Sequence, residues 1–567
     1  MPVDIVMPKL GLTMTEGLIT EWRKKEGDPV KKGEILFVLE TEKVTYEVEA
    51  PEDGTLGKIL VPAQQTVPVG AVVGLLLKPG ESAAAAPSAP AQAASAPASK
   101  APAAGPSPGG KKKIVIVGGG VGGYPAAIRA ARMGAEVTLI EKDALGGTCL
   151  NWGCIPTKSL LQSAGVVQTM KESETFGVKC KGYEVDFGAV MARKNTVVAQ
   201  LTRGVGALLK AKKVKVIQGT ASFVDAKTLQ IKETGETIQG DAVLIASGSV
   251  PGRIPIEGID GPDVMDSNQV LAMKTLPKSV VVIGGGVIGV EFAQFLVAMG
   301  TQVTILEMLP GLVPGVDKEI AALLQKQIAA AGAKVVTGAA VKSIVHRKTE
   351  NAVTYAIGDK TETIIAEKVF LTVGRKPDFS LLGIDKVGIK HERGAIVVNE
   401  FMETSVPGIW AAGDVVGGIM LAHLASAEGE CAVRNILGHR EVMNYRAVPS
   451  CIYTTPEVAS VGLTEEKAKE RGEIQVGRFP LRGNGKALVL NETEGLVKVI
   501  SDKKYGEVLG VHIIGPHATD MIAEAVLGMT LEMTAEELAG AIHPHPTVSE
   551  AVMEAAMAIS GGAIHMP

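Results

Sequence analysis

Two cysteines separated by four residues are the feature of this chain best suited to redox chemistry. Cys149 and Cys154 lie within residues 146–158, together with Gly146, Gly147, Gly153 and Pro156. On an ideal α-helix, residues five apart have Cα atoms about 8.7 Å apart, beyond the roughly 7 Å limit for a disulfide. The glycines and the proline therefore predict an irregular backbone that brings the sulfur atoms together. A zinc half-site and two buried thiols are the alternatives. A zinc site needs two more Cys or His ligands nearby; neither is present, so no metal is expected.

A histidine near the C-terminus is a second candidate for chemistry. His545 lies between two prolines that restrict its backbone, and Glu550 belongs to the helical stretch predicted at 547–558. A carboxylate beside an imidazole can orient it as a general base. The same pair could form a structural salt bridge instead, and the residues alone leave both interpretations open.

Two glycine-rich turns each follow a strand-like run and precede a helical stretch that leads to a second strand ending in an acid. The acids are Glu141 and Glu307. Such a unit binds a dinucleotide, because the glycines let a pyrophosphate approach the helix N-terminus and the acid accepts from a ribose hydroxyl. A carboxylate repels the 2′-phosphate of NADP, so Glu307 favours NAD. The glycines of the two turns are Gly118, Gly120 and Gly123, and Gly284, Gly286 and Gly289.

A lysine between two strand-like runs is a third candidate. Residues 1–79 read as a small all-β module, and a motif around Gly33 recurs around Gly70, which indicates two similar halves. Lys43 lies at the expected tip of a hairpin, where composition alone favours an ordinary surface lysine. Residues 80–110 are almost wholly Ala, Pro, Ser and Gly, and no core can form from them. They could span up to roughly 95 Å, either as the flexible linker of a mobile carrier domain or as an inert spacer.

Composition excludes several classes of function. The 57 Lys and Arg against 61 Asp and Glu, with no basic stripe, make nucleic acid an unexpected partner. The N-terminus lacks a signal-peptide pattern, and apolar stretches such as 279–300 are interrupted before they could span a membrane. Five cysteines in 567 residues do not make a disulfide framework, which indicates a cytoplasmic protein.

Two further segments could contribute to a site. Asp414 follows a short apolar strand and could equally be a helix N-cap. Residues 420–423 begin a helical stretch whose N-terminal amides could face an anionic ring edge.

The combined motifs resemble those of the flavin-dependent disulfide reductases, and among these the dihydrolipoamide dehydrogenase family. The motifs are GGTCxNxGCIPTK at 146–158, the two glycine fingerprints, TxxxxxxAxGD at 404–414 and HPHPTVSE at 543–550, and the resemblance covers 111–567. Residues 39–51, preceded by 7–11, resemble a lipoyl domain, in which the hairpin lysine carries lipoate. Biotinyl domains have Met on both sides of that lysine, whereas Glu42 and Val44 stand here.

The resemblance implies an α/β fold with two Rossmann-like dinucleotide-binding domains and an α+β dimerisation domain, preceded by a small all-β lipoyl domain on a flexible linker. The expected ranges are 1–79 for the lipoyl domain, 80–110 for the linker, 111–262 and 381–448 for the two parts of the FAD-binding domain, 263–380 for the NAD-binding domain and 449–567 for the dimerisation domain.

Roles for individual residues also follow from the resemblance, motif position by motif position. Cys149 is expected to exchange with substrate and Cys154 to face the flavin, where its thiolate makes a charge-transfer complex. His545 is the expected acid–base and Glu550 its orienting partner. Lys158 and Glu291 resemble the pair beside the flavin's reactive nitrogen. Expected FAD contacts are Gly118, Gly120, Gly123, Glu141, Lys142, Gly147, Thr148, Lys158, Ala221, Ser247, Gly248, Ser249, Asp414, Met420, Leu421, Ala422 and His423; expected NAD contacts are Gly284, Gly286, Gly289, Glu291, Glu307, Val341 and Gly374.

The implied reaction oxidises dihydrolipoyl groups to the lipoyl disulfide and reduces NAD to NADH, with FAD and NAD as cofactors and lipoate bound covalently to Lys43. A homodimer is expected, because in this family the His-bearing motif completes the other subunit's site. Expected partners are lipoyl-bearing acyltransferase or carrier components of a 2-oxo acid, acetoin or glycine-cleavage type complex. A non-enzymatic scaffold and a reductase of another disulfide are the alternatives.

Overall fold

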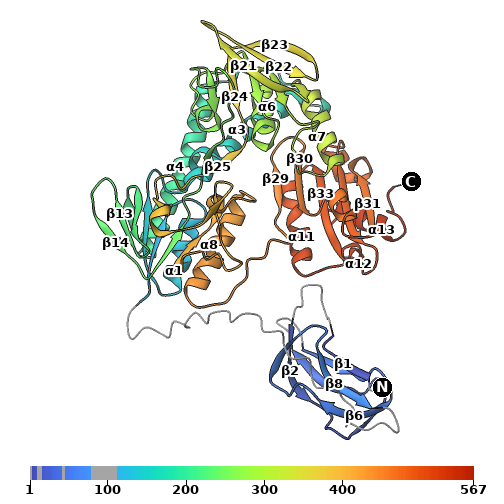
Figure 1. Cartoon of the computed structure of the whole chain (residues 1–567). Coiled ribbons are helices and arrows are strands. Elements are labelled where there is room, and N and C mark those ends of the chain that lie inside the picture. The colour runs from blue at the N-terminus through green and yellow to red at the C-terminus, as the bar shows by residue number, and fades with distance from the viewer. Residues whose placement is uncertain (1–2, 9–15, 41–44, 78–110, 567) are drawn as a thin grey trace. The chain divides into compact units, whose positions relative to one another are not determined.

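The computed structural model describes residues 3–8, 16–40, 45–77 and 111–566. The chain divides into two compact units, Met1–Gly105 and Pro106–Pro567 (Figure 1). The predicted linker at 80–110 lies outside the described residues.

The first unit consists of two four-stranded antiparallel sheets around one apolar core. Leu36, Phe37, Leu56 and Val73 are completely buried in it. The sheet orders are β1-β8-β6-β3 and β5-β4-β2-β7. The second order follows from the first when four is added to each number and eight is subtracted from any sum above eight, which confirms the predicted similarity of the two halves. The strands are β1 (Val3–Val6), β2 (Glu16–Trp22), β3 (Pro29–Val30), β4 (Ile35–Glu40), β5 (Thr45–Glu49), β6 (Gly54–Ile59), β7 (Gln65–Pro68) and β8 (Val72–Leu77).

Strands β4 and β5 pair antiparallel, as the predicted hairpin requires. Lys43 itself is one of the four residues between them and lies outside the described residues.

A parallel five-stranded sheet begins the second unit. Its order is β11-β10-β9-β15-β28, and the last strand comes from more than 160 residues further along the chain than β15. The central strands are almost entirely apolar because helices cover both faces of such a sheet. The elements are β9 (Lys113–Val117), α1 (Gly123–Arg132), β10 (Glu136–Glu141), β11 (Lys215–Gln218), β15 (Ala242–Ile245), β28 (Ile409–Ala411) and α8 (Ala422–Ile436).

A second parallel sheet, of order β17-β24-β18-β19-β20, repeats this plan. An antiparallel sheet of β21, β22 and β23 stands beside it at the top of Figure 1. The elements are β17 (Val264–Asp266), β18 (Ser279–Ile283), α6 (Val287–Ala298), β19 (Gln302–Glu307), α7 (Lys318–Ala330), β20 (Lys334–Thr337), β21 (Ala340–His346), β22 (Asn351–Ile357), β23 (Lys360–Ala366) and β24 (Lys368–Leu371).

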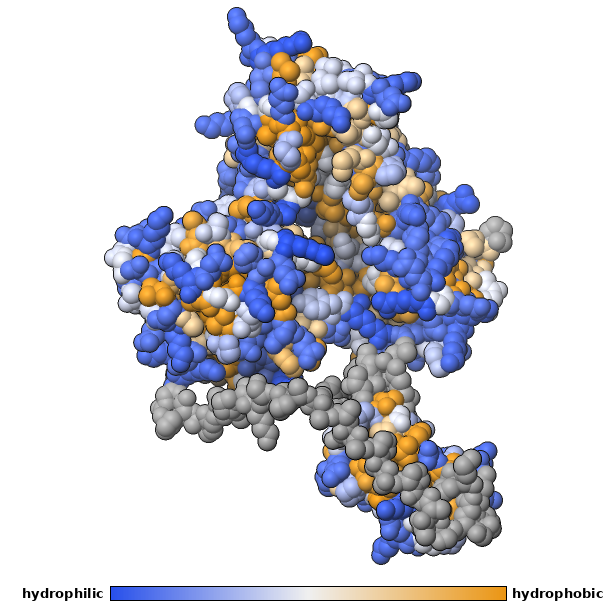
Figure 2. All heavy atoms as spheres, in the orientation of Figure 1, coloured by the Kyte–Doolittle hydropathy of each residue, from blue (hydrophilic) through white to orange (hydrophobic). Residues whose placement is uncertain are grey.

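The C-terminal part is an antiparallel sheet of order β29-β30-β33-β32-β31, packed with helices. Figure 2 shows that one face of the second unit is hollowed between its three lobes, with apolar side chains in the hollow. The elements are β29 (Ser450–Ile452), β30 (Glu457–Gly462), α9 (Glu465–Lys469), β31 (Ile474–Pro480), β32 (Leu496–Asp502), β33 (Val508–Gly515), α11 (Ala518–Thr530), α12 (Ala535–Gly540) and α13 (Glu550–Ser560).

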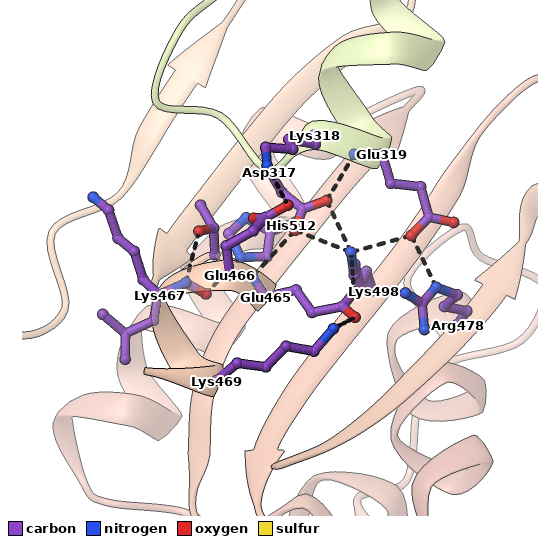
Figure 3. Close-up of polar contacts among 12 residues, drawn as sticks. Asp317, Lys318, Glu319, Glu465, Glu466, Lys467, Lys469, Arg478, Lys498 and His512 are labelled. Carbon is purple, nitrogen blue, oxygen red and sulfur yellow. Dashed lines mark hydrogen bonds and ion pairs between the residues drawn. The ribbon is translucent and has the colours of Figure 1, made fainter. Parts of the chain in front are cut away.

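A buried group of charges joins the second parallel sheet's α7 to the C-terminal sheet (Figure 3). The ammonium of Lys498 on β32 lies 2.9 Å from Asp317, 3.1 Å from Glu319 and 2.7 Å from Glu465. Asp317 also caps α7 and is fully buried. A buried lysine with three carboxylate partners fixes the relative positions of the elements that bear these side chains. Moving one partner away would leave a buried charge uncompensated, which costs free energy.

Replacing Lys498 with methionine should therefore destabilise the second unit by about 3–5 kcal/mol, the cost of leaving a buried charge uncompensated. The midpoint of urea unfolding, followed by tryptophan fluorescence, measures the change. Lys326→Met is the matched control, because the Lys326–Glu494 pair is 3.7 Å long with side chains 71% and 67% exposed. The control should change stability by less than about 1 kcal/mol; equal changes in the two variants would contradict a special role for the buried group.

Candidate active site

The two cysteines lie on two consecutive helices rather than on one. Cys149 belongs to α2 (Gly147–Trp152) and Cys154 begins α3 (Cys154–Glu172). Between the helices Gly153 has φ −145° and ψ −113°, and a Cβ atom there would lie 2.8 Å from the Thr148 carbonyl oxygen. The irregular backbone expected from the sequence is thus present, and glycine is what allows it.

In the reduced Cys149–Cys154 pair, the pKa values of the two thiols are shifted in opposite directions. The hydrogen bond from Cys149 and the ammonium of Lys158 lower the pKa of Cys154 to about 7, against the opposing effect of burial. The same hydrogen bond, together with burial, raises the pKa of Cys149. Free amides at the N-terminus of α3 further favour a thiolate on Cys154. Near neutral pH, negative charge therefore collects on Cys154 and the proton on Cys149.

Three segments of the second unit meet behind Cys154. Lys158, one turn along α3, lies 2.8 Å from Glu291 of α6, whose side chain is 4% exposed. The Tyr453 amide donates to Glu291 at 2.9 Å, and the Tyr453 ring centroid lies 4.5 Å from the Lys158 ammonium. Sequence reasoning named the lysine and the glutamate together but missed Tyr453, for which no local pattern gave a signal.

Replacing Lys158 with methionine should raise the pKa of Cys154 by about one to two units, because a nearby cation is lost while Glu291 remains. A lowered pKa means that the wild-type thiolate forms as pH rises through about 7, and the variant should need a higher pH. The far-ultraviolet absorbance of the reduced protein, minus that of Cys154→Ser, reports the thiolate. Lys158→Arg should keep the wild-type midpoint. If the titration midpoint of Lys158→Met is unchanged, the lowered pKa of Cys154 is due wholly to the hydrogen bond from Cys149 and to the helix N-terminus.

A cavity of about 890 Å³ lies at the carboxyl ends of β9 and β10. Two positions in the wall of the cavity have room only for glycine. A Cβ atom on Gly118 would lie 2.2 Å from the Ala246 carbonyl oxygen, and one on Gly147 would lie 2.7 Å from Gly120 Cα. Asn268 also lines it, and its side-chain oxygen is buried without a partner. The size, the close backbone and the unpartnered acceptor fit a dinucleotide. Ten expected FAD contacts line the cavity: Gly118, Gly120, Glu141, Lys142, Gly147, Thr148, Ala221, Ser247, Gly248 and Ser249.

The two fingerprint acids hold their own turns in the same way. Glu141 accepts from the Gly119 amide at 2.6 Å and from the amide two residues after itself at 2.7 Å. Glu307 accepts from the Gly285 amide at 2.6 Å and again from the amide two residues on. Burial raises the pKa of Glu141. Each carboxylate oxygen keeps a second lone pair, so both acids can still accept from a ribose hydroxyl.

An arginine that sequence reasoning missed links the cavity to the cysteine helix. Arg375 donates to the Ser249 side chain at 2.7 Å and to the Thr148 hydroxyl at 3.2 Å. Asp414 accepts from the Ser249 hydroxyl and lies 4.0 Å from the Arg375 guanidinium, so it is not a helix N-cap. The arginine directly follows Gly374, which was already an expected NAD contact, and that position was the available signal.

The remaining expected FAD contacts do not line the cavity. Gly123 begins α1, where a Cβ atom would lie 1.8 Å from the Gly118 carbonyl oxygen, so it permits close helix–strand packing. Residues 420–423 lead into α8, and the His423 ring lies 2.8 Å from the Pro449 carbonyl oxygen.

The second glycine turn also leaves room for a ligand. A Cβ atom on Gly289 would lie 2.1 Å from the Gly284 carbonyl oxygen, whereas one on Gly286 would meet nothing within 4 Å. This combination of tight packing and open space fits a pyrophosphate at the N-terminus of α6. Val341 lies on β21, and Gly374 with φ +93° precedes β25 (Arg375–Pro377). Glu291, also expected at this turn, contacts Lys158 instead.

His545 and Glu550 form a pair, as expected. The His545 Nδ1 atom lies 2.9 Å from Glu550, which also accepts from the Thr547 amide at 2.8 Å. Burial alone would raise the pKa of Glu550, but the Thr547 amide and the imidazole lower it. The His545 side chain is 78% exposed, so its Nε2 side is open to a reactant.

Three family models match the chain. Residues 112–429 match the pyridine nucleotide-disulphide oxidoreductases, and residues 448–556 match the dimerisation domain of the same group. Residues 3–76 match the biotin/lipoyl domain model described as "biotin-requiring enzyme".

Relatives named dihydrolipoyl dehydrogenase match four fifths of this chain. The chain is 43% identical to dihydrolipoyl dehydrogenase of Geobacillus stearothermophilus, over 80% of this chain and 97% of the relative. The enzyme of the same name from Bacillus subtilis is 41% identical over 80% and 98%. The chain belongs to the dihydrolipoyl dehydrogenase family. The structure of LpdA from Mycobacterium tuberculosis has a TM-score of 0.73 at 28% identity, covering 79% of this chain and 99% of that one. The copper(II) complex of the flavoprotein disulfide reductase RclA from Escherichia coli gives 0.71 at 31%, with the same coverage.

Membership of the dihydrolipoyl dehydrogenase family confirms the fold class and the enzyme class expected from the sequence. The protein is an NAD-dependent flavoenzyme with an added lipoyl-type domain. No helix within the described residues is long and apolar enough to cross a membrane.

Proposed function

We propose that the Cys149–Cys154 pair oxidises dihydrolipoyl groups, including one carried on Lys43 of this chain. The observation that carries the proposal is the polarised dithiol beside a dinucleotide-sized cavity. The site residues and domain boundaries expected from the sequence are part of the proposal, as is a cytosolic setting, which suits a catalytic dithiol.

Each residue has a defined part in the thiol exchange. His545 of the partner subunit removes a proton from the substrate, and the resulting thiolate attacks Cys149, breaking the disulfide and releasing Cys154 as a thiolate. The second substrate thiol then attacks the first sulfur and its proton passes to the departing Cys149, so that the lipoyl disulfide closes and Cys149 is released as a thiol. Lys158 stabilises the Cys154 thiolate throughout. FAD, which the glycines of the cavity would hold, would supply an acceptor for the electron pair of the dithiol, and NAD at the glycine turn before α6 would supply an acceptor for hydride.

Placing a lipoyl domain on the same chain raises the local concentration of substrate. We propose a homodimer that works within a lipoyl-dependent multienzyme complex, in which lipoyl-bearing acyltransferase or carrier components supply further substrate. The dimerisation domain and the lipoyl-type domain support this proposal.

Two measurements test the proposed function. The purified full-length protein should form NADH from dihydrolipoamide and NAD, and negligible turnover with FAD bound would refute the proposed reaction; a panel of other disulfides would then identify the substrate. The intact mass should reveal a lipoyl adduct that is absent from Lys43→Arg. The Lys43→Arg variant should still oxidise free dihydrolipoamide at the wild-type rate, because Lys43 belongs to the carrier and not to the cysteine site.

A further inference from the structure

A buried lysine on the cavity wall has no part in the proposed thiol exchange. Lys194 of α4 (Phe187–Ala211) lines the cavity and is 6% exposed. Its ammonium donates to the Leu271 carbonyl at 2.6 Å. No carboxylate of the described residues forms an ion pair with it, and burial alone lowers its pKa.

A buried ammonium with one neutral acceptor is costly, because two of its three N–H groups and its charge remain uncompensated. Three acidic side chains line the same cavity: Asp143 is exposed and forms no ion pair with Lys194 among the described contacts, and the other two have partners of their own. Glu141 accepts from two backbone amides, and Asp378 pairs with Lys142 at 2.9 Å. Asp266, on the neighbouring segment, caps α5 (Ser267–Val270). An anion inside the cavity is therefore the natural compensation for Lys194.

We propose that Lys194 is a cofactor-binding residue whose ammonium is the counter-charge for an anionic group of FAD within this cavity. FAD offers two such groups, the diphosphate in every state and the ring system after reduction. The inference rests on the proposed function, because it requires FAD in this cavity.

Two substitutions separate charge from hydrogen bonding. Lys194→Gln keeps a donor for the Leu271 carbonyl and removes the charge, whereas Lys194→Arg keeps the charge. The full-length holoproteins should be compared for FAD release on dilution, by flavin fluorescence, and for the midpoint potential of the bound flavin. We expect Lys194→Gln to bind FAD roughly tenfold or more weakly and Lys194→Arg to resemble the wild type. Weaker FAD binding at an unchanged midpoint potential would identify the diphosphate as the anionic partner of Lys194. A more negative midpoint potential would identify the reduced ring system as that partner.

Lys112→Gln is the matched control, because Lys112 also donates to a single backbone carbonyl, that of Ile436, but outside the cavity. It should leave both readouts unchanged. Unchanged FAD release and potential in Lys194→Gln would overturn the inference, as would equal losses in the glutamine and arginine variants. If Lys194→Gln does not fold, Asn268→Asp adds a carboxylate to the same wall and should weaken FAD binding; unaltered binding would count against the inference. A wild-type protein that never holds FAD would refute the proposed function itself.

Discussion

Replacing Cys154 with serine is expected to lower dihydrolipoamide-dependent NADH formation at least a thousandfold, because residues that act as one catalytic unit lose nearly all activity when one is removed. Serine cannot form the disulfide that the substrate thiolate must open, nor leave as a stabilised anion. Cys149→Ser should be equally inactive for the same reason. NADH formation in the presence of excess dihydrolipoamide is the direct measurement.

The control for this prediction is an exposed cysteine outside the site, Cys180. Cys180→Ser should keep full activity. The Cys154→Ser protein should retain FAD and still oxidise NADH with ferricyanide, a reaction that does not need the thiols, which separates loss of chemistry from loss of folding. Substantial dihydrolipoamide turnover by Cys154→Ser would exclude the pair as the redox centre and favour a scaffold role for the chain.

The parts of the site that the sequence predicted depend on short-range geometry. The spacing of Cys149 and Cys154 and the glycines around them dictate a break between two helices, and the structure has it at Gly153. The two glycine turns, each with its strand and acid, are equally local. Such features can be inferred because backbone sterics act over a few residues.

The features that were missed depend on packing between distant segments. Tyr453 reaches Glu291 across 162 positions of sequence, and Arg375 reaches Thr148 across 227. Lys498 lies in a strand that reads as apolar, yet it is the centre of a buried charge cluster. Local pattern contains no information on which remote carboxylate a side chain will meet, so these contacts emerge only from the folded structure.

The exposure of His545 leads to the second large prediction. In this chain alone, His545 is 78% exposed, and it contacts Glu550 without any hydrogen bond or ion pair to the cysteines among the described contacts. If it serves the partner's cysteines, a base held by one subunit acts on the dithiol of the other. His545→Gln should then reduce turnover by roughly 10²- to 10⁴-fold, the usual contribution of a general acid–base, with FAD content unchanged.

Mixed dimers decide between action within one subunit and action across the dimer. A hybrid of a Cys149→Ser subunit and a His545→Gln subunit contains both intact cysteines in the second and the intact histidine in the first. If the site is shared, one complete site forms, and hybrids purified by two different affinity tags should have about half the wild-type activity, although each parent is inactive. If His545 serves its own subunit, neither site is complete and the hybrid should be as inactive as its parents. Hybrids of Cys149→Ser with Cys154→Ser are the control, because no complete cysteine pair exists in them under either arrangement. The test thus asks directly whether His545 of one chain completes the cysteine site of a second copy. We expect this arrangement because His545 pairs with Glu550 and has no hydrogen bond or ion pair to the cysteines of its own chain among the described contacts.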